Sequence, residues 1–291
     1  MLSSIKLSPA RLSVILMLSW IASYAQAQAP VEDFLTNQIL FSKQQFTSHD
    51  ALLVTNSSGN IVYQWQADKA LIPASLTKLL TANLAIKKWG LDHRFVTEFY
   101  MVENQLWVKG FGDPYLVSQE LDLIAAQIVQ LLSSTAREIE SIHIDSSAIA
   151  RETVPGRTQV ADPYNAPLSA VAANFNTVML QRINGSLVSA EPQTPLTGTA
   201  KNVANKLTKI IGEKPNRVNL IDANRAQQHF VELLSLKLDQ HHEAKPSAPV
   251  KRLSINQTLP SHSRLLLRYE NSKTLADVLR GALEYSNNFI A

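Results

Sequence analysis

The stretch PASLTK occupies residues 73–78 and begins an amphipathic segment that continues to Gly90. On a helix, a serine and a lysine three positions apart project from one face, with their Cβ atoms about 5–6 Å apart. Ser75 and Lys78 have this spacing. An amine placed there can take the proton of a hydroxyl, provided that burial or a neighbouring cation keeps the amine unprotonated. The stretch therefore predicts a serine nucleophile that works without a histidine.

A helix over residues 73–90 is predicted by its apolar period and by its ends. Pro73 stands near the start, and Gly90 is a suitable C-terminal cap. Ser75 would lie in the first turn, where unpaired N–H groups and the helix dipole favour negative charge. An N-cap serine is the structural alternative, and both interpretations stay open at this point. The apolar positions are Leu76, Leu79, Leu80, Leu84 and Ile86.

The first residues of the chain are typical of a secretory leader. Lys6 and Arg11 precede an apolar run over residues 12–22, and residues 25–27 read Ala-Gln-Ala, which a signal peptidase can recognise. The run is shorter than the roughly 20 residues that a spanning helix needs, and no later segment approaches that length. Ser3 and Lys6 repeat the spacing of the serine and lysine above, so spacing alone is weak evidence for catalysis. We expect a signal peptide over residues 1–27 and a periplasmic protein without a transmembrane anchor.

Composition narrows the class of protein. The 291 residues include 27 Lys and Arg against 24 Asp and Glu, and removal of the leader leaves a nearly neutral chain. A nucleic-acid partner is not expected on charge grounds. The chain contains no cysteine, so it can form neither a disulfide nor a lipid-anchored thioether. The remaining length suffices for one large domain or two smaller ones.

Mixed α and β structure is predicted along the chain. Residues 31–41 are expected to form a short helix, and residues 51–55 and 61–65 a hairpin around the turn-forming residues 56–60. In the middle, strands are expected at residues 94–100, 106–109 and 141–145, and a helix at residues 121–132 that Ser118 caps. The dipeptide Asn184-Gly185 predicts a second hairpin, between residues 177–180 and 186–188.

A third block contains a second candidate motif. An apolar-periodic stretch at residues 230–238 is followed by a soft linker at residues 241–249 and a helix at residues 274–283. Ser286 and Asn288 come directly after that helix, where they can share a proton relay and bind a peptide-like substrate. The same spacing occurs at Ser58 and Asn60, and at Ser254 and Asn256. The former pair is better explained as a turn, and the latter as strand or loop.

Four blocks, in this order, resemble the insertion-bearing low-molecular-mass penicillin-binding proteins (DacB-like). These are the serine-type D-Ala-D-Ala carboxypeptidases and endopeptidases of the bacterial envelope. The blocks are residues 51–100 with 71–82 at their centre, the stretch GDPYL at 112–116, the stretch YNAPLSA at 164–170 and the stretch EYSNNFIA at 284–291. The similarity covers nearly the whole mature chain and is looser in the middle. Four ordered blocks are more specific than any one motif.

The resemblance implies an α+β fold: a penicillin-recognising domain of the β-lactamase and transpeptidase type, split by an inserted α+β module. Residues 28–95 and 225–291 would form the catalytic domain, and residues 96–224 the inserted module. The implied substrate is a peptidoglycan stem peptide ending in D-Ala-D-Ala, and β-lactams would be inhibitors. No cofactor is implied.

The resemblance also implies a role for each matched residue. Ser75 would attack the carbonyl of the terminal D-Ala-D-Ala bond and form an acyl-enzyme. Lys78 would be the general base, although the group that takes the proton is disputed among related enzymes. Ser286 would relay a proton to the leaving amine, and Asn288 would orient Lys78 and the substrate amide. Asn287 stands where related sequences often have aspartate.

One family motif is absent from residues 1–291. A Lys-Thr-Gly or Lys-Ser-Gly strand, which supplies an oxyanion donor and binds the substrate carboxylate, has no counterpart; Thr197-Gly198-Thr199 follows a leucine. Loss of one oxyanion donor typically costs about a hundred- to a thousandfold in rate. We therefore expect residues 1–291 to be the N-terminal part of an active enzyme, with a catalytic domain that is incomplete at its C-terminus and inactive alone.

The alternative function is a non-catalytic peptidoglycan-binding envelope protein, which would bind stem peptides through the inserted module and a degenerate cleft. Such a protein has no need of the serines and lysine described above. A metal site is not expected, because neither His241-His242-Glu243 nor His143 with Asp145 has the His-Glu-x-x-His spacing. Asp113 is expected to be a turn residue.

Overall fold

The computed structural model describes residues 47–134, 138–149, 160–241 and 252–291. The expected signal peptide, the expected helix at residues 31–41 and most of the expected linker at residues 241–249 lie outside these ranges. The chain divides into two compact units, residues 1–72 and 73–291, which are considered separately. Within the described ranges, no helix has both the length and the apolar character needed to cross a bilayer.

The first unit contains the predicted hairpin. Strands β1 (Leu52–Thr55) and β2 (Ile61–Trp65) pair antiparallel. In the turn, Asn56 Oδ1 accepts hydrogen bonds from the backbone N–H groups of Ser58, at 3.0 Å, and Asn60, at 2.9 Å. This Asx-type turn confirms the prediction made from the residues between the strands.

The second unit is built on a five-stranded sheet with the order β10-β3-β4-β5-β9. Its strands are β3 (Arg94–Val102), β4 (Gln105–Gly110), β5 (Ser141–Asp145), β9 (Arg252–Gln257) and β10 (Arg264–Thr274). Strands β10, β3 and β4 are antiparallel, whereas β5 runs parallel to both β4 and β9. Gly110 is required at the end of β4, because a Cβ atom there would lie 2.1 Å from the carbonyl oxygen of Ala170.

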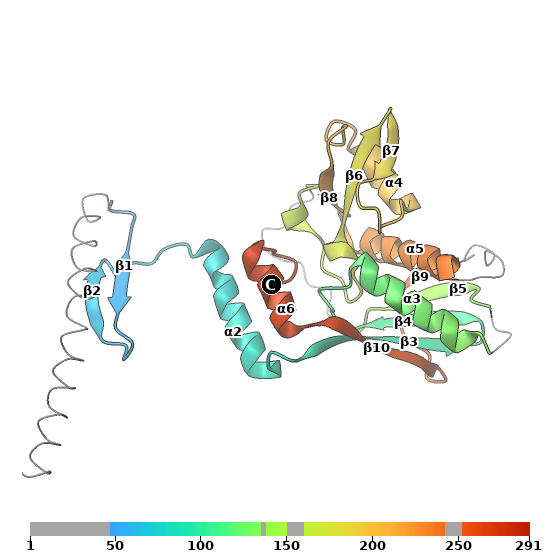
Figure 1. Ribbon diagram of the computed structural model, residues 1–291, viewed down its shortest axis with the longest axis horizontal. Helices are drawn as coiled ribbons and strands as arrows, with labels where there is room; N and C mark the ends of the chain where they lie inside the picture. Colours follow the sequence, from blue (N-terminus) through green and yellow to red (C-terminus); the bar gives the residue numbers. More distant parts are fainter. Residues whose placement is uncertain (1–46, 135–137, 150–159, 242–251) are drawn as a thin grey trace, which may run out of the picture. The chain divides into compact units, whose positions relative to one another are not determined.

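Two helices cover one face of this sheet and enclose the main core. Figure 1 shows α3 (Ser118–Leu132) and α5 (Ala223–His241) side by side over the strands. Phe99, Leu106, Ile124 and Phe230 are fully buried between the layers. Each such side chain contributes about 1.5–3 kcal/mol of transfer free energy.

A smaller sheet, with the order β7-β6-β8, carries a second core. It consists of β6 (Thr177–Ile183), β7 (Ser186–Ser189) and β8 (Asn216–Asn219), and it packs against α4 (Gly198–Lys206). The β6–β7 hairpin confirms the prediction made from Asn184-Gly185. Ala226 of α5 belongs to this second core and Phe230 to the first, so one helix takes part in both.

Helices α2 (Thr77–Trp89) and α6 (Leu275–Glu284) hold the two candidate motifs. Gly90 is the C-cap of α2, as predicted. Thr274 and Asp277 form a capping box at the start of α6. The backbone N–H groups of Leu275 and Ala276 donate to the carbonyls of His93, at 2.7 Å, and Leu91, at 3.0 Å. The start of α6 is therefore tied to the segment that follows α2.

Some expectations differ from the structure. Ser118 is not the N-cap of α3; Val117 is. The Ser118 hydroxyl instead makes hydrogen bonds with Asn174, at 2.8 Å, and Thr194, at 2.7 Å. The sequence reading also missed α4, β8 and β10, since none of these segments carries a clear apolar period. The helix at residues 73–90 is confirmed, although the five apolar residues that predicted it are exposed and its buried residues are Lys78 and Ala82.

Candidate active site

Ser75 and Lys78 lie on consecutive turns of one helical segment. The 3-10 turn η1 (Ala74–Leu76) carries Ser75 and leads directly into α2, whose second residue is Lys78. The hydroxyl of Thr77 donates to the carbonyl of Ala74 at 2.8 Å and holds this junction together. Ala74 has a φ of 47°, which costs a non-glycine residue about 1–2 kcal/mol. The backbone just before the candidate nucleophile is therefore strained.

The second motif follows α6 in a tight loop. The backbone N–H of Asn287 donates to the carbonyl of Ala282 at 3.0 Å, and Asn287 Oδ1 accepts the N–H of Phe289 at 2.9 Å. An aspartate oxygen could accept the same hydrogen bond as the Asn287 amide oxygen, which explains how this position tolerates either residue. Ser286 has a φ of 50°, so strained backbone occurs at this motif too.

The structure brings all four predicted site residues together, although they come from segments more than 200 positions apart. Lys78 Nζ donates to Asn288 Oδ1 at 2.6 Å, to Ser75 Oγ at 3.2 Å and to Ser286 Oγ at 3.5 Å. The Ser286 hydroxyl donates to Ser75 Oγ at 2.7 Å. The amine is thus hydrogen-bonded to all three partners, and the two hydroxyls form a continuous path for a proton.

Exposure differs among these groups in a way that suits a nucleophile. Lys78 is only 7% exposed. Ser75 and Asn288 are exposed and Ser286 is half-buried. A ligand can therefore reach the Ser75 oxygen while the amine that contacts it is shielded from water.

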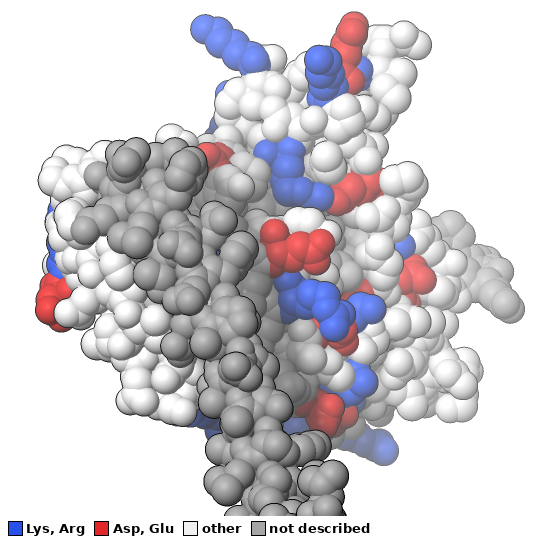
Figure 2. Space-filling model, turned by 60° about the vertical axis from the view of Figure 1, so that its left-hand side comes forward, with Lys and Arg blue, Asp and Glu red and all other residues white. Residues whose placement is uncertain are grey.

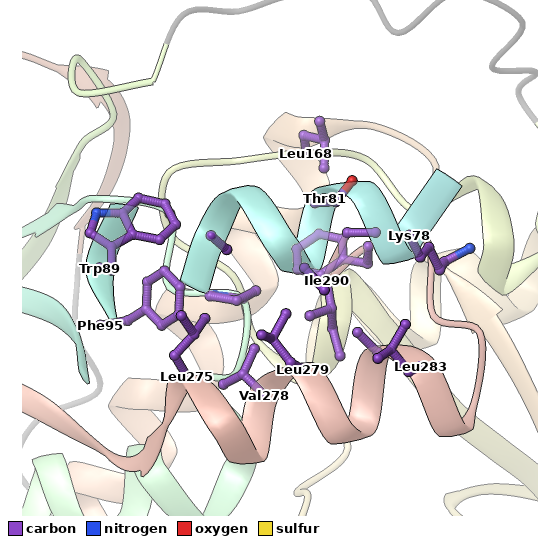
Figure 3. Close-up of a pocket in the computed structure, with 17 residues that line it drawn as sticks. Lys78, Thr81, Trp89, Phe95, Leu168, Leu275, Val278, Leu279, Leu283 and Ile290 are labelled. Atoms are coloured by element: carbon purple, nitrogen blue, oxygen red, sulfur yellow. The ribbon is translucent and has the colours of Figure 1, made fainter. Parts of the chain in front are cut away.

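Two hollows adjoin this cluster. Figure 3 shows an apolar groove of about 330 Å³ between α2 and α6, with Lys78 at one end and Trp89 and Phe95 at the other. A second hollow, of about 270 Å³, is lined by Asn288 together with aromatic residues and Arg217. Arg217 also forms an ion pair with Glu191. On the face that Figure 2 displays, basic and acidic side chains are interspersed.

Sequence reasoning missed a buried polar network between the turn before α3 and the end of β10. Asp113 acts as the expected turn residue, since its Oδ1 accepts the backbone N–H of Tyr115 at 2.8 Å. Its Oδ2 also accepts a hydrogen bond from the fully buried Asn271, at 2.8 Å. Burial raises the pKa of the Asp113 carboxyl to about 6. Asn271 lies near the end of β10, four residues before α6 begins. No sequence pattern linked these two residues, which are 158 positions apart.

The structure describes His143, Asp145 and His241 of the two sequences considered for metal binding, whereas His242 and Glu243 lie outside the described residues. His143 stacks on Trp107 and its Nε2 lies 2.9 Å from the hydroxyl of Ser141. His241 lies 3.4 Å from Asp122. Among the described residues, no three histidine, cysteine or acidic side chains gather as a metal site would require.

Comparisons with known proteins found a family match and a curated relative. A family model described as "D-Ala-D-Ala carboxypeptidase 3 (S13) family" matches residues 40–291. The chain is 27% identical over 168 residues to the D-alanyl-D-alanine carboxypeptidase of Actinomadura sp. (strain R39), an alignment that covers 53% of this chain and 31% of that protein.

Solved structures share the fold. The crystal structure of penicillin binding protein 4 (dacB) from Haemophilus influenzae superposes with a TM-score of 0.58 at 15% identity, over 87% of this chain and 63% of that one. The structure of the same protein complexed with a β-lactam gives a TM-score of 0.50 at 18% identity, over 80% and 57% of the two chains. The chain thus spans less than two thirds of the length of these relatives. The α+β, penicillin-binding fold is confirmed.

Proposed function

Because the chain belongs to the D-Ala-D-Ala carboxypeptidase 3 (S13) family, we propose that Ser75 is the nucleophile of a serine-type D-alanyl-D-alanine carboxypeptidase or endopeptidase. The substrate is a peptidoglycan stem peptide that ends in D-Ala-D-Ala, and β-lactams acylate the same serine. The observation that carries the proposal is the convergence of Lys78 and Ser286 on the Ser75 oxygen, with Asn288 hydrogen-bonded to the Lys78 amine.

The proposed reaction proceeds through an acyl-enzyme. Ser75 Oγ attacks the carbonyl carbon of the penultimate D-alanine, and its proton passes to Lys78, 3.2 Å away. The C–N bond then breaks, and the departing D-alanine amine receives a proton through Ser286. Water hydrolyses the ester and regenerates the Ser75 hydroxyl. Asn288 holds the Lys78 amine in place through their hydrogen bond.

We also propose the domain organisation and export that the resemblance implies. Residues 28–95 and 225–291 belong to the catalytic domain, residues 96–224 form the inserted module, and residues 1–27 direct export to the periplasm. Strand β10 pairs with β3, so strands from both sides of residue 224 share one sheet. Limited proteolysis is therefore the test of where the inserted module ends and the catalytic domain resumes.

The 291 residues contain no Lys-Thr-Gly sequence. Since one oxyanion donor is worth about a hundred- to a thousandfold in rate, we expect residues 1–291 by themselves to turn over a D-Ala-D-Ala peptide at least a hundredfold more slowly than typical carboxypeptidases of this family. Release of D-alanine from such a peptide measures this directly, and ordinary turnover would contradict the expectation.

Covalent labelling tests the nucleophile. The protein expressed from its complete gene is incubated with a fluorescent penicillin, beside a Ser75→Ala variant and a Ser133→Ala control. Ser133 is exposed at the end of α3, so its loss leaves labelling unchanged. Labelling of the wild type and the control, but not of Ser75→Ala, supports the proposal. Persistent labelling of Ser75→Ala refutes it. An unlabelled wild type that still binds stem peptides identifies the non-catalytic peptidoglycan-binding protein instead.

A further inference from the structure

Three consecutive residues in the turn directly before β6 adopt a left-handed conformation. Asn174, Phe175 and Asn176 have φ angles of 48°, 62° and 52°. Asparagine tolerates this region because its short side chain can hydrogen-bond locally, whereas phenylalanine does not. Strain of about 1–3 kcal/mol at such a residue persists only where the surroundings enforce it, and it is concentrated at functional sites.

The two asparagines enforce the conformation. Asn174 is buried. Its side-chain Oδ1 accepts the backbone N–H of Ser118 at 2.9 Å, and its backbone N–H donates to the carbonyl of Leu116 at 3.0 Å. Asn176 is fully buried, and its side-chain amide donates to the carbonyl of Pro167 at 2.7 Å. Both neighbours of Phe175 are therefore anchored, and Phe175 cannot relax by itself.

The enforced turn directs the Phe175 ring toward the loop that follows α6. Its centroid lies 6.3 Å from that of Phe289, with the ring planes at 71°. On its other side, the ring lies 5.5 Å from that of Tyr115 at 80°. Edge-to-face pairs of this kind contribute about 0.5–1.5 kcal/mol each beyond their buried area. The three rings link the turn before β6 and the turn before α3 to the loop that carries Asn288.

Phe289 is the residue directly after Asn288, whose Oδ1 accepts the 2.6 Å hydrogen bond from Lys78. A ring that fixes Phe289 also restricts the backbone of Asn288. We propose that Phe175 is a positioning residue: held in a strained conformation by Asn174 and Asn176, it fixes Asn288 against Lys78 through Phe289. This inference rests on the proposed function of Lys78 and Asn288.

A glycine substitution separates this role from folding. Glycine adopts positive φ without strain. Phe175→Gly therefore loses the ring contacts but is also relieved of the backbone strain. Because the two effects offset each other, its urea midpoint is expected to stay near that of the wild type. Acylation by a fluorescent penicillin is expected to slow by about 10- to 100-fold at saturating penicillin, the cost of misplacing a group by about 1 Å. The half-saturating concentration is expected to change little. Phe175→Tyr, which keeps the ring, restores the rate.

Asn184→Gly is the matched control, since Asn184 also has a positive φ, of 51°, in the β6–β7 turn. It is expected to acylate as the wild type does. The decisive comparison adds Phe175→Gly to Asn288→Ala, where it is expected to cause no further loss, because residues that act through one contact are not additive.

Three results would overturn the inference. Phe175→Gly could acylate at the wild-type rate, or it could slow acylation by the same factor in the Asn288→Ala background as in the wild type. It could also raise the half-saturating penicillin concentration without changing the rate at saturation. The last result would mean that the ring contacts the ligand. In each case the labelled wild type and the unlabelled Ser75→Ala variant show that the proposed function itself still stands.

Discussion

At the residue scale, Lys78 has the most demanding position in the molecule. Lys78 is 7% exposed, and its amine donates a 2.6 Å hydrogen bond to Asn288, which lies 210 positions later in the chain. If Lys78 takes the proton of Ser75, Lys78→Met should slow acylation by about 10²–10⁴-fold, the usual contribution of a general base. Lys87→Met, an exposed substitution on the same helix, is the control. Equal rates of fluorescent penicillin labelling for the two variants would exclude this role.

Asp113 predicts a pH dependence of stability. Burial raises its pKa from 3.8 to about 6 in the folded protein. Because the folded state holds this proton more tightly than the unfolded chain, the contribution to stability is fully present below about pH 4 and is lost as the pH rises through 6. The loss is roughly 2–3 kcal/mol. Urea unfolding from pH 4 to 7 should show the wild type losing this amount relative to Asp113→Asn, and a constant difference would contradict the assignment.

At the scale of an element, α6 depends on its capping box. The Thr274 hydroxyl accepts the backbone N–H of Asp277 at 3.4 Å, and Asp277 Oδ2 accepts the N–H of Thr274 at 3.1 Å. Thr274→Ala should lower the free energy of unfolding by about 1 kcal/mol, whereas Thr274→Ser keeps the cap and should be nearly neutral. Urea midpoints at unchanged slope measure both. Equal midpoints for the two variants would show that the cap contributes nothing.

At the scale of the whole molecule, α5 takes part in both cores of residues 73–291, and we expect the two cores to unfold as one cooperative unit. Its residue Ala226 packs in the smaller core and Phe230 in the larger. Leu180→Ala in the smaller core should cost about 2–5 kcal/mol and lower the hydrogen-exchange protection of β4 by the same amount as that of β6. Loss of protection in β6 alone would show that the cores unfold separately.

Local signals were enough to predict many of the elements. The Asn56 turn, the Asn184-Gly185 hairpin and the helix between Pro73 and Gly90 carry their own turn and cap chemistry, and all three are confirmed. Strand β10 was missed because Arg264–Thr274 lacks alternation and is stabilised by pairing with β3, which lies about 170 residues earlier. The prediction that Ser118 is the N-cap of α3 was wrong, because the Ser118 hydroxyl makes a tertiary hydrogen bond with Asn174 instead.

The sequence by itself determined the family and the four candidate site residues, because short motifs depend on spacing within one helix or loop and their order along the chain is specific. Only the tertiary structure decided that these residues meet: Lys78 of the first motif is hydrogen-bonded to Ser286 and Asn288 of the second, more than 200 positions away. It also decided two features that no motif indicated: the buried pair of Asp113 and Asn271 and the left-handed Phe175. Such contacts join residues that share no local pattern, so they arise only when burial and hydrogen bonding are satisfied across the whole fold.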